Sequence, residues 1–123
     1  MRAERQQAMI LRTKRFALAV IRLYASLSRA TVHQVLGKQV LRSATSVGAH
    51  YREACRAKSN ADFVSKIEGA LQELDETVYW LELLRDSDSA QIAAVEPLET
   101  EANELISIFV TVTKSVKALS AAR

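Results

Sequence analysis

The sequence predicts an all-α fold: an antiparallel up-down-up-down four-helix bundle that forms one domain over residues 1–123. The chain contains only three glycines and one proline, which leaves little material for the turns of a strand-rich fold. Its apolar residues recur with the period of about 3.6 residues that places them on one side of a helix. The segments with this period are long and their connections are short, a combination that favours antiparallel neighbours. We expect helices over residues 3–28, 34–57, 60–85 and 95–120.

The first expected helix, residues 3–28, has one apolar face with a stripe of arginines beside it. The apolar face contains Met9, Phe16, Ala17, Val20, Leu23, Tyr24 and Leu27. Leu11 and Leu18 lie outside this face. The stripe consists of Arg5, Arg12, Arg15, Arg22 and Arg29. Thr31 and Gln34 have the spacing of a capping box, so we expect Thr31 to cap the helix that follows.

The second expected helix, residues 34–57, separates an apolar face from a basic one. The apolar face contains Leu36, Val40, Ala44, Val47, Tyr51 and Ala54, and the opposite side carries Lys38, Arg42, Arg52 and Arg56. Ala44 and Gly48 lie one turn apart, and their small size predicts that a neighbouring helix approaches closely at this point.

The third expected helix, residues 60–85, begins at a cap formed by Ser59 or Asn60, with Asp62 complementing the helix dipole in its first turn. Its main apolar stripe contains Phe63, Ile67, Ala70, Leu71, Leu74, Val78 and Leu81. A second apolar patch is formed by Tyr79, Trp80, Leu83 and Leu84. Between the two lies an acidic row at seven-residue spacing: Glu68, Asp75 and Glu82.

The fourth expected helix, residues 95–120, places Pro97 in its first turn. Backbone N–H groups in the first turn have no acceptor within the helix, so the absence of an N–H in proline costs no hydrogen bond there. Its apolar residues alternate at spacings of four and three: Leu98, Ala102, Leu105, Phe109, Val112, Val116 and Leu119. This spacing predicts that the helix packs along its whole length.

The second apolar patch of residues 60–85 exceeds what a solitary bundle needs. Exposed patches rich in aromatic residues usually mark interfaces. We therefore expect a homo-oligomer whose interface uses this patch together with Leu11 and Leu18. The alternative is that another helix or the chain ends cover the patch within one monomer.

The charges divide the chain into two unlike halves. Residues 1–58 hold twelve Lys and Arg against two acids, whereas residues 59–123 hold five against twelve, so the net charge of +3 conceals a basic half and an acidic half. Such asymmetry is evidence about partners. It predicts a basic surface that binds RNA or DNA backbones with little sequence preference. The residues expected there are Arg5, Arg12, Arg15, Arg22, Arg29 and Lys38.

A second function class stays open. If these cations pair with the acids of other helices, the basic field is largely cancelled. The protein is then a structural or adaptor oligomer with internally paired charges and a protein partner.

A metal centre is not expected. Three glutamates, Glu53, Glu73 and Glu76, could suggest a di-metal carboxylate site within a bundle. Such a site also needs Glu-x-x-His motifs on two helices, and neither His33 nor His50 follows a glutamate by three residues. We instead expect a structural polar network, in which arginines hold partly buried carboxylates. Its members are Arg42, Arg52, Glu53, Arg56, Glu73 and Glu76.

An enzyme is not expected either. Cys55 lies at an apolar margin, where a structural thiol is the ordinary role. The glycines all fall within helices, so there is no phosphate-binding loop, and no Ser/His/Asp arrangement is recognisable. We expect no cofactor and no small-molecule substrate. The run Phe16–Ile21 is too short for a membrane span, so a cytoplasmic protein is expected.

The most distinctive stretch of the sequence lies between residues 34 and 85. It contains QVLRSATSVGA at residues 39–49, YREACRA at 51–57 and DETVYWLELL at 75–84, with Ser59, Phe63, Lys66 and Glu73 between them. These motifs resemble the 23S ribosomal RNA intervening-sequence protein family, small bacterial four-helix bundle proteins. His50 stands where such sequences usually have asparagine, which leaves open the polar contact made at this position.

The resemblance implies more than the fold. Family members are encoded within intervening sequences of ribosomal RNA genes or elsewhere in genomes, and they are expected to form homopentamers around a central channel. The fold is also similar to the accessory protein of diversity-generating retroelements, a basic homopentamer that binds nucleic acid and a reverse transcriptase. The resemblance thus implies self-association, nucleic acid and an RNA-handling enzyme as partners.

Overall fold

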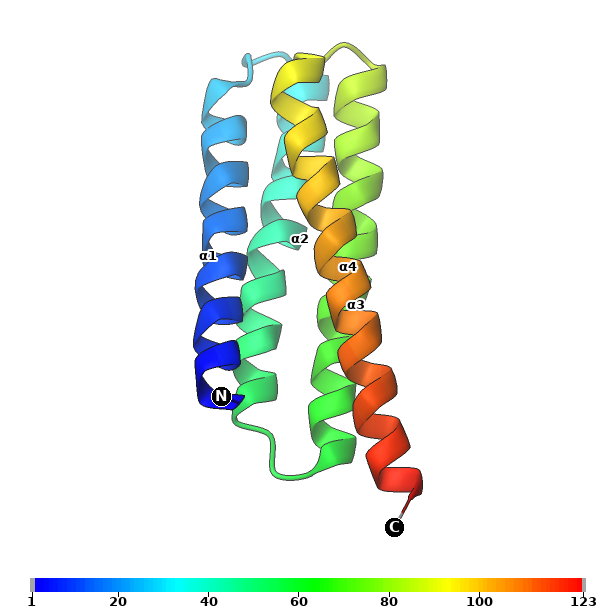
Figure 1. Cartoon of the computed structure of the whole chain (residues 1–123). Helices are drawn as coiled ribbons and strands as arrows, with labels where there is room; N and C mark the ends of the chain where they lie inside the picture. The colour runs from blue at the N-terminus through cyan, green and yellow to red at the C-terminus, as the bar shows by residue number, and fades with distance from the viewer. Residues whose placement is uncertain (1, 123) are drawn as a thin grey trace.

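The computed structural model describes residues 2–122 and contains four long helices (Figure 1). They are α1 (Arg2–Ser26), α2 (Thr31–Cys55), α3 (Asn60–Asp86) and α4 (Ile92–Ala121). Consecutive helices run in opposite directions, so both ends of the chain lie at the end of the bundle that holds the α2–α3 connection, here called the lower end (Figure 1). This arrangement confirms the predicted all-α four-helix bundle.

Helices α1 and α3 lie diagonally across the bundle, because each packs against α2 and α4 and, in the described residues, not against the other. The α2–α3 pair is packed most extensively, and α1 meets α4 over the shortest stretch. Figure 1 shows that α4 runs obliquely and leans away from α1 toward the lower end. The backbones of α1 and α4 therefore lie farther apart at the lower end than at the other (Figure 1).

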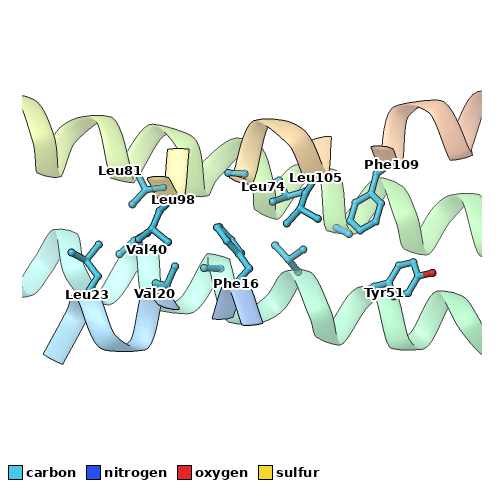
Figure 2. Close-up of a cluster of buried hydrophobic side chains, with 14 of the residues drawn as sticks. Phe16, Val20, Leu23, Val40, Tyr51, Leu74, Leu81, Leu98, Leu105 and Phe109 are labelled. Carbon is cyan, nitrogen blue, oxygen red and sulfur yellow. The ribbon is translucent and has the colours of Figure 1, made fainter. Parts of the chain in front are cut away.

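The core is a continuous column of apolar side chains contributed by all four helices (Figure 2). Each fully buried Leu, Val, Ile or Phe stabilises the fold by about 1.5–3 kcal/mol relative to an exposed side chain. Near the lower end, the rings of Tyr51 and Phe109 stack at 5.5 Å between centroids. The labelled members of the column in Figure 2 are Phe16, Val20, Leu23, Val40, Tyr51, Leu74, Leu81, Leu98, Leu105 and Phe109.

Glycines bring α1 and α2 close together, as the sequence predicts at Gly48. A Cβ atom at Gly48 would lie 3.2 Å from the hydroxyl oxygen of Thr13 on α1. A Cβ atom at Gly37 would lie 2.6 Å from Leu27 and 2.8 Å from the ring of Tyr24. Both positions therefore allow a close approach that a larger residue would prevent.

Helix α2 begins at Thr31, earlier than expected, and the predicted capping box is wrong. Ala30 occupies the cap position, and no side chain caps it. The side-chain amide of Gln34 instead donates to the carbonyl oxygen of Ser28 at 2.8 Å and accepts from the hydroxyl of Tyr24 at 2.8 Å. Gln34 is therefore held by the end of α1 and cannot fold back onto its own helix start.

The starts of α3 and α4 give one confirmed and one wrong prediction. Ser59 caps α3 by accepting a hydrogen bond from the backbone N–H of Asp62 at 3.0 Å, as expected. Helix α4 begins at Ile92, so Pro97 lies in its second turn rather than its first. The alanine-rich residues before Pro97 have high helix propensity, which extends the helix ahead of the proline. No helix in the described chain is long and apolar enough to cross a membrane.

Candidate nucleic-acid interface and neighbouring surfaces

Five of the six cations predicted to bind nucleic acid are exposed and form no ion pair within residues 3–122: Arg5, Arg15, Arg22, Arg29 and Lys38. The sixth, Arg12, lies on the α4 side of α1 and donates hydrogen bonds of 2.8 and 2.7 Å to the carboxylate of Glu101. Its Nη2 also lies 3.8 Å from Glu104, and the hydrogen bond to Glu101 raises the pKa of Arg12. Arg12 is therefore already paired with acids of α4, unlike the other five cations.

A shallow groove runs between α1 and α2 on the outside of the bundle. Lys14 of α1 and Arg52 of α2 both line it, in two adjoining hollows of about 420 and 300 Å³. Lys38 is exposed on α2 about four turns before Arg52 and shares its helix face, and the exposed Arg56 directly follows the end of α2. We call Lys14, Lys38, Arg52 and Arg56 the α1–α2 seam. Its members form no ion pair with any described residue.

Arg52 and Arg56 do not join the polar network predicted for them. Arg42 holds the two carboxylates of α3: its Nη2 lies 2.7 Å from Glu76 Oε1, and its Nη1 lies 3.5 Å from Glu73 Oε1. The hydrogen bond to Glu76 raises the pKa of Arg42. At about 100° per residue, Arg52 is rotated by about 80° from Arg42, toward α1 and away from α3. The network prediction is therefore confirmed for Arg42 and wrong for Arg52 and Arg56.

His50 extends this network, a contribution that the sequence reasoning missed. Its Nδ1 lies 3.6 Å from Glu53 Oε2, and its Nε2 lies 3.8 Å from Glu73 Oε2. Lys66 of α3 approaches the other oxygen of Glu53 at 3.8 Å. The spacing of His50 and Glu53, three residues apart on one helix, was the signal that could have predicted their contact. Arg42, His50 and Lys66 thus each approach a glutamate of this interface, and the contacts of Arg42 with Glu73 and Glu76 and of Lys66 with Glu53 join α2 to α3.

The second apolar patch is smaller than predicted. Tyr79 is 54% exposed, whereas Leu84 is fully buried and belongs to the core, so the prediction for Leu84 is wrong. Leu84 continues the buried spacing of Leu81, three residues earlier. Trp80 and Leu83 are half-buried; the ring of Trp80 packs against Tyr79 at 5.1 Å and against the core.

The outer faces of α1 and α3 have complementary character. On α1, Leu11 and Leu18 are 45% and 40% exposed, and Arg15 and Arg22 lie one turn after each of them. On α3, Tyr79 is flanked by Asp75 and Glu82, which form no ion pair with any other described side chain. We call Leu11, Arg15, Leu18 and Arg22 the α1 face, and Asp75, Tyr79 and Glu82 the α3 face. Because α1 and α3 are diagonal, the two faces point to opposite sides of the bundle.

Side chains with metal-binding or nucleophilic chemistry are scattered. Across residues 3–122, no group of three or more His, Cys, Asp or Glu side chains is placed to hold a metal ion. Cys55 is a free, half-buried thiol beside Tyr51. Burial, with a smaller contribution from Cys55, raises the pKa of Tyr51, so its hydroxyl stays protonated at neutral pH.

Comparisons with known proteins place this geometry in a family. Residues 5–111 match the model of the 23S rRNA-intervening sequence proteins. The chain is similar to a solved protein of unknown function from the S23 ribosomal protein family of Bacteroides thetaiotaomicron, with 35% identity and a TM-score of 0.82. That alignment covers 89% of this chain and 97% of the other. Among curated proteins, none matches significantly. On the family match, this chain belongs to the 23S rRNA-intervening sequence protein family.

Proposed function

We propose that this protein is a non-enzymatic, self-associating bundle that binds the phosphate backbone of RNA or DNA through the α1–α2 seam. The observation that carries the proposal is the set of cations without an acid partner among the described residues. Within the basic half these are Arg5, Lys14, Arg15, Arg22, Arg29, Lys38, Arg52, Arg56 and Lys58. A field of this kind attracts phosphate before contact and gains affinity from the release of bound counterions.

The seam is suited to backbones rather than to bases. Lys14 and Arg52 stand on opposite sides of one groove, so a phosphate above the groove can contact both cations. The described lining otherwise consists of Gln7 and small or aliphatic residues, and it includes no aromatic ring on which a base could stack. The family description, which refers to an intervening sequence of ribosomal RNA, makes structured RNA the first probe to use.

The α1 and α3 faces support the proposed self-association. In one copy, leucines are flanked by arginines; in the next copy, a tyrosine is flanked by acids. Contact between unlike faces is heterologous, so it continues from copy to copy until a ring closes. The pentamer implied by the family resemblance is one such closed ring. In this assembly the α1 face is covered. Leu11 of that face also lines the hollow that holds Lys14 and Arg52, so a neighbouring copy would lie directly beside the seam.

The adaptor function is the second candidate, and specific contacts favour it. Three arginines are paired with acids of another helix: Arg12 with Glu101, Arg42 with Glu76 and Arg85 with Glu99. These pairs reduce the positive potential of the surface. If the remaining cations contact a protein partner, the seam is an acidic-peptide site instead of a phosphate site. The difference between the two candidates is measurable as nucleic-acid affinity.

The experiment is a salt titration of binding to a fluorescently labelled structured RNA and a duplex DNA. The variant is Lys14→Glu with Arg52→Glu, and the control is Lys114→Glu, an exposed cation of α4 that forms no ion pair with a described residue. We expect the variant to lose about tenfold or more in affinity at low salt and to lower the log–log salt slope by about 1–2, with the control unchanged. Undetectable binding at low salt, or equal losses in variant and control, would contradict the phosphate proposal and favour the adaptor.

A further inference from the structure

A cavity of about 400 Å³ opens at the lower end of the bundle. It lies between the first turns of α1, the α2–α3 connection and the C-terminal half of α4, where α4 leans away from α1 (Figure 1). Its volume is within the range of about 300–1,000 Å³ that small-molecule sites occupy. It does not overlap the α1–α2 seam.

The interior of the cavity is apolar and partly aromatic. Phe63 of α3 and Val112 and Val116 of α4 form walls around the edge of Tyr51. The ring of Tyr51 is fixed by stacking on Phe109, and its hydroxyl points away from the core cluster (Figure 2). The hydroxyl is neutral at physiological pH, as in any tyrosine, and burial raises the pKa of Tyr51 further. These walls suit a flat, uncharged ring.

The rim of the cavity is basic and polar. Arg5 and Lys58 both line it, and neither side chain pairs with an acid within residues 3–122. None of the described residues that line the cavity is acidic; the neighbouring carboxylate of Asp62 accepts a hydrogen bond from the backbone N–H of Lys58 at 3.3 Å. Gln6 and Asn60 add amide donors and acceptors between the cations and the apolar walls.

We propose that this cavity binds a nucleoside 5′-phosphate, with the base against Tyr51 and Phe63 and the phosphate between Arg5 and Lys58. Asn60 Nδ2 already donates to Ser120 Oγ at 3.2 Å. An aliphatic anion fits less well, because it would bury the amide of Gln6 without a partner, whereas the edge of a base can satisfy it. The same chemistry has two sources: a free mononucleotide, or an unpaired nucleotide of a bound nucleic acid. The second source rests on the proposed function, and the first does not.

The first test uses free ligands and isothermal titration calorimetry. Adenosine 5′-monophosphate is compared with ribose 5-phosphate, which lacks the base, and with adenosine, which lacks the phosphate. We expect the mononucleotide to bind at least tenfold more tightly than either fragment. Lys58→Glu should abolish this binding, since the exposed side chain has no role in packing. Val112→Trp should also abolish it by filling the cavity, with circular dichroism verifying that the bundle is folded.

The second test separates the two sources. Binding of a blunt RNA hairpin is compared with that of the same hairpin carrying an unpaired 3′ nucleotide. If the extended hairpin binds more tightly than the blunt one, and Lys58→Glu removes this difference, the natural ligand is an unpaired nucleotide of a nucleic acid. If the two hairpins bind wild type equally well, the natural ligand is the free mononucleotide. The seam variant Lys14→Glu with Arg52→Glu should keep its affinity for the free mononucleotide, so failure of the backbone proposal is recognised independently. The cavity proposal is overturned if the mononucleotide binds no better than ribose 5-phosphate, or equally well to wild type and Lys58→Glu.

Discussion

The hydroxyl oxygens of Ser43 on α2 and Thr77 on α3 lie 2.8 Å apart inside the fully buried interface between the two helices. The hydroxyl of Thr77 also lies 2.7 Å from the backbone carbonyl oxygen of Glu73. Because a hydroxyl has one proton, Thr77 donates to the Glu73 carbonyl and accepts from Ser43. The two side chains thus satisfy each other in a place that water does not reach.

Replacing Thr77 by valine should destabilise the fold more than the lost atoms alone would suggest. Ser43 would keep only a 3.4 Å contact with the carbonyl oxygen of Val40, so a buried hydroxyl is left nearly unpaired. We expect the free energy of unfolding, measured by urea denaturation, to fall by about 1–3 kcal/mol. Adding Ser43→Ala should recover part of this loss. Thr45→Val, at an exposed site of α2, is the control, and an equal effect there would contradict the argument.

Gly37→Ala should destabilise the bundle, although alanine is the better helix former by about 1 kcal/mol. The new Cβ would lie 2.8 Å from the ring of Tyr24, which its hydrogen bond to Gln34 holds in place. Overpacking of this kind costs about 1–3 kcal/mol, so we expect a net loss of stability in thermal unfolding. Gly69→Ala is the matched control. Its Cβ would lie 3.2 Å from the half-exposed ring of His50, which can move outward, so a gain in stability is expected.

Assembly should depend on the α1 and α3 faces. Tyr79→Ser should shift sedimentation equilibrium at micromolar concentration toward the 13.6 kDa monomer, because aromatic anchors often contribute about 2 kcal/mol or more to an interface. Tyr79 is a cleaner test than Trp80, whose half-buried ring also supports the core. Lys38→Ala serves as the control and should leave the assembly unchanged.

Charge reversal tests whether the two faces meet. Arg15→Glu with Arg22→Glu should dissociate the assembly through repulsion from the acids of the neighbouring copy. Adding Asp75→Lys and Glu82→Lys to the same chain should restore it, because each reversed face then meets its opposite again. If the wild-type protein sediments only as a monomer, the assembly proposal is wrong. If the variant with all four substitutions associates no more than the variant with two, the two faces do not pair in this way.

The pKa of Asp86 should be lower in the folded protein than its ordinary value of 3.8. The cause is a hydrogen bond of 2.9 Å from Arg85, which favours the charged carboxylate. The pair therefore contributes stability at neutral pH, and the contribution is lost as the pH falls through the pKa of Asp86. NMR titration of the carboxyl carbon should show this pKa rising toward 3.8 in Arg85→Gln.

Periodicity was sufficient to predict the bundle, because each helix must bury one face and the apolar spacing marks that face. Periodicity gave the wrong assignment where two adjacent residues of a helix could each be the buried one. At Leu84, the buried spacing of α3 continues past Leu81, so a residue assigned to an exposed patch lies in the column of Figure 2. The capping-box prediction for the start of α2 was wrong for a different reason. The side chain of Gln34 is hydrogen-bonded to Tyr24 and to the carbonyl oxygen of Ser28, tertiary contacts that the local sequence pattern does not reveal.

The cations of the candidate site were harder to predict. A stripe at seven-residue spacing identifies exposed arginines, but it does not identify the acid that each one reaches. Arg12 and Arg15 are three residues apart, yet Arg12 binds Glu101 while Arg15 is unpaired within the described chain. Lys14 was missed because it becomes significant only beside Arg52, across a groove that two helices form together.

The oblique path of α4 gives the four helices unequal protection against local unfolding. Because α1 meets α4 over the shortest stretch, where Arg12 pairs with Glu101, we expect α1 to detach before the more extensive α2–α3 interface opens. Such an opening requires less free energy than global unfolding. In hydrogen–deuterium exchange, the amides of α1 should therefore exchange through a separate, lower-energy opening, and those around Ser43 and Thr77 should exchange only when the whole chain unfolds.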